Sequence, residues 1–205
     1  SDEASDCIAC GAGKYAGAAG RGDETVCIDC VAGQYVDVTG SDEASDCIDC
    51  VAGTYVEGSG SSLESQCTAC ESGKYSSVLG SASESNCIDC VAGKYVDVAG
   101  SDSSTDCIDC VAGTYVEAVG SDSSSDCIGC VAGRYSTVLG SAAVVNCIAC
   151  TAGRYVVASG SDDASDCAAC VAGRYSSVSG SSRVDDCIDC VAGRYVDVTG
   201  SDEAS

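Results

Sequence analysis

Cys30-Val31-Ala32-Gly33-Gln34-Tyr35 is one copy of a segment that recurs every 20 residues along this chain. A pair of cysteines follows it in Cys47-Ile48-Asp49-Cys50, and the second of them opens the next copy. Cysteines occupy positions 7, 10, 27, 30 and onward to 187 and 190, and a tyrosine lies five residues after the second cysteine of every pair. Glycines hold two further columns, 13 through 193 and 20 through 200. The unit reads S-D-x-x-S-D-C-I-D-C-V-A-G-x-Y-V-x-V-x-G and occurs ten times without insertion or deletion.

The composition restricts what such a repeat can build. The 205 residues include 20 Cys, 25 Gly and 10 Tyr but no Pro, Phe, Trp, Met or His. Each unit offers only an Ile, two or three Val, an Ala and a Tyr for burial, and the cysteine content is typical of a disulfide or metal scaffold. A net charge of −23 argues against nucleic acid or an anionic membrane surface as a partner. No apolar run is long enough to span a bilayer.

Nothing in the repeats predicts catalysis. The chain contains no His, and no Ser or acid stands apart from the repeating background. An array of equal units also offers no unique pocket. We therefore expect no catalytic residue and no cofactor, and we do not expect the chain to be an enzyme.

Local signals predict the shape of one unit. Val31–Gln34 contains a glycine and predicts a turn. Tyr35–Val38 is rich in β-branched and aromatic residues and predicts a short strand. Gly40–Ser45 is a polar loop that can reverse the chain, and Asp46–Cys50 is a second extended piece. Each unit is therefore expected to be a two-stranded β-finger.

One finger cannot fold alone, because its few apolar side chains do not offset the entropy of ordering 20 residues. We therefore expect a small disulfide-rich β fold, a linear rod of ten stacked fingers. Residues 1–205 form a single array: ten repeats in 1–200 and the first five residues of an eleventh. The chain opens and closes on the same Ser-Asp-Glu-Ala-Ser and has no atypical capping repeat, so we expect an excerpt of a longer polymer.

Three uses of the cysteines compete, and structural disulfides are the one we favour. The spacing C-x2-C-x16-C-x2-C fits four-thiolate zinc sites, but adjacent repeats are equivalent, whereas paired sites should alternate. Redox catalysis needs a thiol of lowered pKa, and acids inside the motif, such as Asp29 and Asp49, act in the opposite direction. We therefore predict no metal ligands among the cysteines.

The pattern C-x-x-G-x-Y…C-x-x-C, as in Cys30–Tyr35 and Cys47–Cys50, resembles the ephrin-receptor-like cysteine-rich repeats. It is also similar to the first finger of TNF-receptor cysteine-rich modules. The resemblance covers all ten repeats through their Cys, Gly and Tyr columns. In that family, tandem copies occur in long extracellular proteins, which are abundant in algae and other protists. The family usually has Pro after the second Cys, where this chain most often has Val, as at Val31.

The resemblance implies that the second Cys of each repeat bonds to the first Cys of the next. Each bond would close a loop of 18 residues, worth about 3 kcal/mol through the entropy of the unfolded chain. Cys7 and Cys190 would keep no partner within the chain, and pairing inside each C-x-x-C remains the alternative. The implied pairs are Cys10–Cys27, Cys30–Cys47, Cys50–Cys67, Cys70–Cys87, Cys90–Cys107, Cys110–Cys127, Cys130–Cys147, Cys150–Cys167 and Cys170–Cys187.

Three further columns have a structural and a functional interpretation each. The residue before Tyr is basic in seven repeats and is either a solvated face or a partner of acids such as Asp89 and Asp189. The Tyr column is a packing ladder, with a carbohydrate-contact surface or a dityrosine site as alternatives. Acidic loops such as 41–46 are solvated, with weak Ca²⁺ binding as the alternative. The O-glycosylation candidates in the loops are Ser103, Ser104, Thr105, Ser123, Ser124 and Ser125.

The sequence therefore predicts a structural component of an extracellular filament or surface appendage, stiffened by disulfides between repeats. Its partner would be itself, end to end, with glycans as further ligands of the loops and the negative charge keeping rods apart. The alternative is the cysteine-rich ectodomain stalk of a receptor or adhesin that binds a protein ligand. Both place the chain outside the cell or at its surface.

Overall fold

The fold is described from a computed structural model, which describes residues 7–17 and 26–203. In these residues 18 short strands form nine antiparallel sheets of two strands each. No α-helix occurs in this part of the chain. The strands are β1 (Lys14–Ala16), β2 (Cys27–Asp29), β3 (Gln34–Tyr35), β4 (Ile48–Asp49), β5 (Thr54–Tyr55), β6 (Thr68–Ala69), β7 (Lys74–Tyr75), β8 (Ile88–Asp89), β9 (Lys94–Tyr95), β10 (Ile108–Asp109), β11 (Thr114–Tyr115), β12 (Ile128–Gly129), β13 (Arg134–Tyr135), β14 (Ile148–Ala149), β15 (Arg154–Tyr155), β16 (Ala168–Ala169), β17 (Arg174–Tyr175) and β18 (Ile188–Asp189).

From β3 onward, each loop between the two strands of a finger contains a 3₁₀-helix of one turn. These helices are η3 (Ala44–Asp46), η4 (Glu64–Gln66), η5 (Glu84–Asn86), η6 (Ser104–Asp106), η7 (Ser124–Asp126), η8 (Val144–Asn146), η9 (Ala164–Asp166) and η10 (Val184–Asp186). The loop predicted from Gly40–Ser45 is therefore more ordered than its polar composition indicates. The prediction of a small disulfide-rich β fold built from repeated β-fingers is confirmed.

The strands are shorter than the four residues predicted for Tyr35–Val38. β3 ends at Tyr35 because the next amide, Val36 N, donates to Ser61 O in the following finger at 3.0 Å. Tyr35 also forms a parallel bridge with Ser61. The backbone therefore leaves its own hairpin after two residues and pairs with its neighbour.

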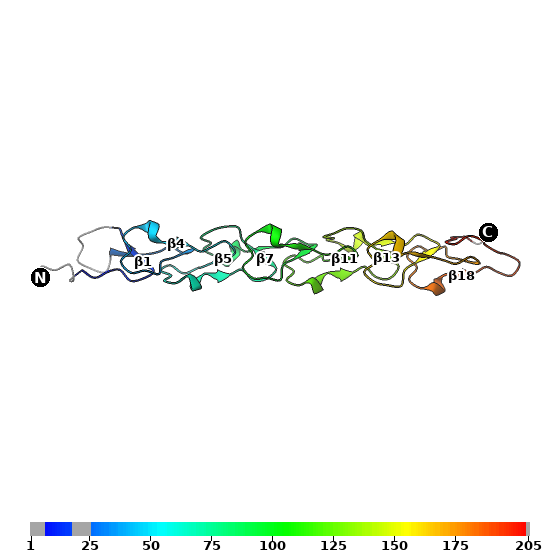
Figure 1. Ribbon diagram of the computed structural model, residues 1–205, viewed down its shortest axis with the longest axis horizontal. Coiled ribbons are helices and arrows are strands. Elements are labelled where there is room, and N and C mark those ends of the chain that lie inside the picture. Colours follow the sequence, from blue (N-terminus) through cyan, green and yellow to red (C-terminus); the bar gives the residue numbers. More distant parts are fainter. Residues whose placement is uncertain (1–6, 18–25, 204–205) are drawn as a thin grey trace. The chain divides into compact units, whose positions relative to one another are not determined.

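Contacts divide the chain into two compact units, Ser1–Cys90 with Val96–Asp106, and Val91–Tyr95 with Cys107–Ser205. Within each unit, every finger meets the next through backbone hydrogen bonds that recur at equivalent positions. In the first unit, Gly33 N donates to Val56 O and Gly60 N donates to Cys30 O, both at 2.8 Å. Figure 1 shows the fingers following one another in sequence order within each unit.

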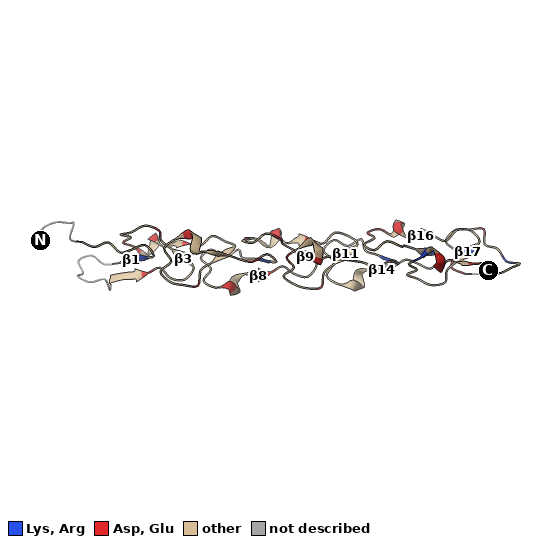
Figure 2. Ribbon diagram, turned by 90° about the horizontal axis from the view of Figure 1, so that it is seen from below, with Lys and Arg blue, Asp and Glu red and all other residues tan. Residues whose placement is uncertain are grey.

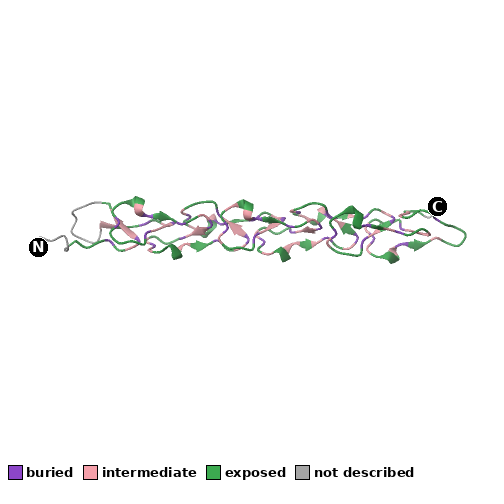
Figure 3. Ribbon diagram, in the orientation of Figure 1, coloured by how far each residue is buried: buried purple, intermediate pink, exposed green. Residues whose placement is uncertain are grey.

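The interior of a finger consists of its disulfide and small side chains. Figure 3 shows buried segments alternating with exposed ones along the chain. One core cluster is Cys30, Val36 and Cys47, with Tyr15 of the preceding finger packed against it. The expectation that Ile and several Val residues are buried is wrong for Ile and for the Val after the second Cys, because Ile48 is 47% exposed and Val51 is 56% exposed. The Val after Tyr is buried, as Val36 is. The buried branched side chain, as at Val36, lies beside the disulfide, and most other branched side chains of the unit lie outside.

Candidate functional site

The candidate site is the row of disulfides and the loops that each of them closes. Eight bonds are observed, all with a sequence separation of 17 and Cα–Cα distances of 5.6–5.8 Å. They are Cys10–Cys27, Cys30–Cys47, Cys50–Cys67, Cys70–Cys87, Cys110–Cys127, Cys130–Cys147, Cys150–Cys167 and Cys170–Cys187. Cys90 and Cys107 are also disulfide-bonded.

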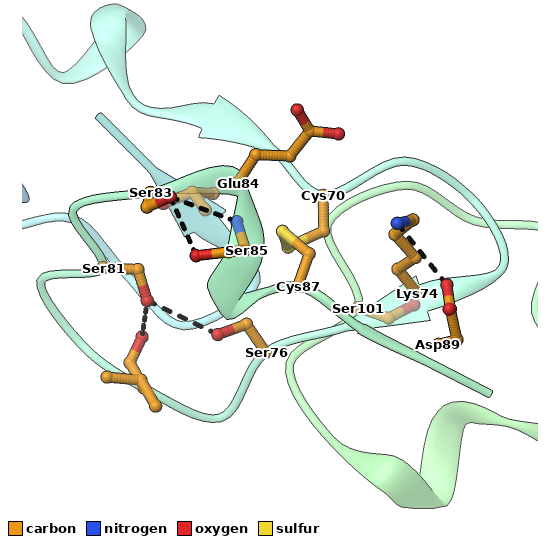
Figure 4. Close-up of a disulfide and its surroundings, with 12 residues drawn as sticks. Cys70, Lys74, Ser76, Ser81, Ser83, Glu84, Ser85, Cys87, Asp89 and Ser101 are labelled. Carbon is orange, nitrogen blue, oxygen red and sulfur yellow. Dashed lines mark hydrogen bonds and ion pairs between the residues drawn. A yellow bond between two sulfur atoms is a disulfide. The ribbon is translucent and has the colours of Figure 1, made fainter. Parts of the chain in front are cut away.

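Each observed bond joins the second Cys of one pair to the first Cys of the next, so none of them lies within a C-x-x-C (Figure 4). Cys7 and Cys190 are free thiols, the first exposed and the second partly buried. Among residues 7–17 and 26–203, no group of three or more His, Cys, Asp or Glu is placed to hold a metal ion. The same residues include no helix long and apolar enough to cross a membrane.

Glycine allows a finger to touch the finger after the next, as at two positions 80 residues apart. Gly33 has a φ of +90°, and a Cβ on it would lie less than 3.0 Å from Gly80 O. The same approach recurs between Gly113 and Gly160 O in the second unit. The sequence predicts this glycine column only as a turn, because the close approach depends on stacking that no single repeat encodes.

The last acid of a loop stabilises the 3₁₀-helix. Asp46 Oδ2 accepts hydrogen bonds from Asp42 N at 3.0 Å and Glu43 N at 3.2 Å. Gln66 Oε1 accepts from Ser62 N and Leu63 N at the equivalent place. The sequence analysis missed this role, although the recurrence of Asp, Asn or Gln directly before the first Cys was a visible signal for it.

Hydrogen bonds also lower the pKa of a second loop acid. The backbone amide of Ser165, followed by its hydroxyl, lowers the pKa of the Asp163 carboxyl, because both donors favour the charged form. Asp163 is therefore a structural acceptor within its own loop.

The residue before Tyr lies across the sheet from the second of the two residues between the cysteines of the next pair. Lys94 Nζ lies 2.8 Å from Asp109 Oδ1, and Arg174 Nε lies 2.7 Å from Asp189 Oδ1. Figure 4 shows the corresponding pair Lys74–Asp89, at 3.4 Å. These cations therefore face acids, and Figure 2 shows that acids also occupy many of the loops.

Where Ala replaces the acid, the cation takes a backbone partner instead. Arg134 lies opposite Ala149 and its Nη1 donates to Cys147 O at 2.7 Å. Arg154 lies opposite Ala169 and donates to Cys167 O at 2.9 Å. The position before Tyr is thus a cross-strand position in every finger, whatever its partner is.

Two tyrosines pack against the core cluster of the next finger, whereas Tyr195 is 79% exposed. Tyr15 lies against the Cys30 cluster, and Tyr135 lies against Cys150, Val156 and Cys167. Partial burial raises the pKa of Tyr35, and the carboxylates of Glu64 and Asp37 raise it further. Partial burial likewise raises the pKa of Tyr55, with contributions from Glu84, Glu57 and Glu71. Both phenols therefore stay neutral over a wider pH range than a free tyrosine.

The glycosylation candidates fall into two groups. Ser103 Oγ accepts from Thr105 N and lies 2.8 Å from Thr105 Oγ1, and Ser123 makes the same contacts with Ser125. Both of these first serines are half-buried. Ser104, Thr105, Ser124 and Ser125 are exposed. The last group is the more accessible to a modifying enzyme.

Shallow hollows repeat along the loops. One is lined by Tyr115–Asp122 with Ser125, Asp126 and Ile128. Another is lined by the equivalent residues 40 positions later, Tyr155–Asp162 with Asp166 and Ala168. Because both hollows occupy the same place in a finger, they are features of the repeat and not a unique pocket.

Comparison with known proteins agrees with the resemblance seen in the sequence. The family model described as tyrosine-protein kinase ephrin type A/B receptor-like matches residues 53–107 and 80–127. No curated protein matches the chain. Modules of this type and a high density of disulfides indicate an extracellular or surface location. The resemblance read from the Cys, Gly and Tyr columns is thereby confirmed: the tandem repeats of residues 53–127 match the ephrin-receptor-like cysteine-rich family.

Proposed function

We propose that this chain is a structural component of an extracellular filament or surface appendage, with itself as its end-to-end partner. The observation that supports this best is the uniform joint between fingers. Gly33 N, Val36 N and Gly60 N all bond to the backbone of a neighbouring finger, and equivalent bonds recur in both units. A joint made of backbone atoms is independent of the surface residues, so it can be repeated without limit.

Self-association in series follows from the same joint. The two sides of a finger are different and complementary, so the contact is head-to-tail, and a head-to-tail contact that does not close into a ring produces a filament. Each finger is closed by its disulfide, as Cys30–Cys47 closes one of them. The net charge of −23 opposes unspecific aggregation of the strands.

The proposal assigns no catalysis, no cofactor and no metal to the chain. Asp46 and Asp163 support this for the loops, because their carboxylates already accept backbone amides and are less available to Ca²⁺. Glycans on Ser104, Thr105, Ser124 and Ser125 fit the proposal, since these hydroxyl groups belong to exposed residues. An intact mass equal to that of the bare chain would remove the glycans from the proposal.

A second candidate function is the ectodomain stalk of a receptor or adhesin. The match of residues 53–127 to an ephrin-type receptor-like family favours it. In such a stalk the repeats hold a ligand-binding part away from the membrane, and the stalk length would matter more than any end-to-end contact.

Imaging of the native cell surface separates the two functions. Antibodies against the exposed loop 121–126 would be bound to gold and applied to unfixed cells. The filament predicts continuous fibres with gold along their length, and these fibres should come apart after the disulfides are reduced. Discrete single particles at the cell surface would reject the filament and support the stalk.

A further inference from the structure

One loop differs from all others in its polarity. Residues 136–146 carry no charge, and 141–146 is the only segment between a loop glycine and the next cysteine that lacks an acid. Its apolar side chains are exposed: Leu139 is 67% exposed and Val145 is 79% exposed. Val138 and Val144 are about half-exposed. Isolated exposed apolar residues are common, but four in one loop form a patch.

A sister loop, 76–86, provides a matched comparison 60 residues earlier. It has the same Val-Leu-Gly-Ser-Ala sequence at 78–82, but Glu84 and Ser85 stand where the apolar loop has Val144 and Val145. Figure 4 shows this sister loop beside its disulfide. Its 3₁₀-helix, η5, corresponds to η8. The two loops thus differ mainly in side chains at the surface.

The two loops are also held in the same way. Val144 N donates to Glu117 Oε1 at 3.1 Å, and Glu84 N donates to Glu57 Oε1 at 3.4 Å. An acid of the preceding finger therefore binds the equivalent amide in each loop. The difference in polarity between the loops rests on positions 83–85 and 143–145.

The apolar side chains lie at repeat positions that line a hollow in the preceding finger. There Val119 and Ser125 line the hollow. Leu139 and Val145 occupy the same two places in the 20-residue register. The patch therefore combines the end of one arm of the finger with the 3₁₀-helix, and it extends beyond a single side chain.

We propose that loop 136–146 is a docking surface for the same loop of a second copy, so that strands associate side by side. The charge distribution selects this occupant. Two chains of net charge −23 repel each other, and every other loop adds acids to that repulsion. The loop 136–146 itself carries no charge, so two copies meet here with the least repulsion, in a contact that is the same from both sides.

The size of the patch makes each contact weak. It offers a few hundred Å² on each copy, and stable interfaces bury about 1,200 Å² or more in total. A weak lateral contact gains strength when many copies are joined in series, because the second contact is then intramolecular. The inference goes beyond the end-to-end filament and does not depend on it.

Sedimentation equilibrium of the full oxidised chain tests the proposal. The chain would be measured from about 10 μM to about 1 mM, at low and at high salt. We expect a monomer–dimer equilibrium that strengthens with salt, because salt screens the repulsion and leaves the apolar contact. The double variant Val144→Glu with Val145→Ser gives these two positions the residues of the sister loop, while Ala143 stays in the place of Ser83, and it should weaken dimerisation by about tenfold or more.

The converse variant provides the matched control. Glu84→Val with Ser85→Val gives the sister loop the apolar pair and should strengthen association beyond that of the unmodified chain. Both variants place residues where the same chain already accommodates them, and hydrogen exchange of the Cys147 and Cys87 amides would verify folding. A chain that stays monomeric throughout, or dimers unaffected by the change at 144–145, would overturn the proposal and assign the patch to another partner.

Discussion

The fingers closed by Cys30–Cys47 and by Cys130–Cys147 bury the same repeat positions but differ in surface charge. The first carries four acids between its cysteines, and the second carries none and one arginine. Val36 in the first and Ser136 in the second are both fully buried, at 1% and 0% exposure. The comparison shows that cysteines, glycines and backbone contacts specify the finger, and that its surface is free to vary.

The largest effect should come from removing the disulfide of either finger. Replacing Cys30 and Cys47 by Ala, or Cys130 and Cys147 by Ala, should each cost about 3 kcal/mol of local stability, because both bonds close loops of equal length. Hydrogen exchange of the loop amides would measure the loss, and peptide mapping without reduction would test the pairing in the unmodified chain. Recovery of zinc with free thiols would contradict the disulfides.

Replacing one glycine in either finger should destabilise the contact of that finger with the finger after the next. Gly33→Ala and Gly133→Ala place a Cβ against Gly80 O and Gly180 O at positive φ, so each should cost about 2 kcal/mol or more. Gly58→Ala is the control, since a Cβ there meets nothing within 4 Å and the equivalent residue is Ala118. Protection of the Gly33 and Gly133 region against exchange should fall only in the first two variants.

The residue before the first Cys stabilises the loop through different contacts in the acidic and the apolar finger, so its replacement should have different effects in the two. Asp46→Ala removes the acceptor of two backbone amides and should cost about 1 kcal/mol in the loop 41–46. Asp46→Asn keeps a carbonyl oxygen, as Gln66 does, and should lose much less. In the apolar finger, Asn146 Nδ2 donates to Ser141 Oγ at 2.9 Å, so its replacement acts on a different contact. Amide exchange of Asp42 and Glu43 would report the first change.

The smallest effect should come from the cross-strand position. Gln34 Nε2 donates to Asp49 Oδ1 at 2.9 Å, whereas Arg134 faces Ala149. Asp49→Ala should cost about 0.5 kcal/mol, and Ala149→Asp should gain a similar amount at low salt. Thermal unfolding at two salt concentrations would measure both, and a gain at Ala149 that survives high salt would contradict an ion pair.

Local patterns predicted the parts of the fold that one repeat encodes. The period, the finger and the turn at Gly33 follow from the Cys, Gly and Tyr columns, because each feature depends on residues close in sequence. The exposure of Ile48 and the early end of β3 did not follow, since both depend on the neighbouring finger. The contact of Gly33 with Gly80 joins a finger to the finger after the next, so it could not be predicted from the sequence of a single repeat.

The same limit applied to the candidate site. Its cysteines were visible as a column, and their pairing came with the family resemblance. The acceptor role of Asp46 was hidden, because a polar loop with acids is equally typical of a solvated or ion-binding segment. The single array over residues 1–205, the excerpt of a longer polymer and the end-to-end partner stay predictions.

The disulfides also determine which residues would carry mechanical tension. From Cys30 the covalent path crosses to Cys47, whose Cα is 5.7 Å away, and continues through the short link to Cys50. Pulled taut, this path spans about 16 Å per finger, compared with about 70 Å for 20 residues without the bond. Residues 31–46 lie outside the path and bear no load. An oxidised array therefore resists stretching while its loops stay folded, and reduction lets each finger extend to roughly four times that length.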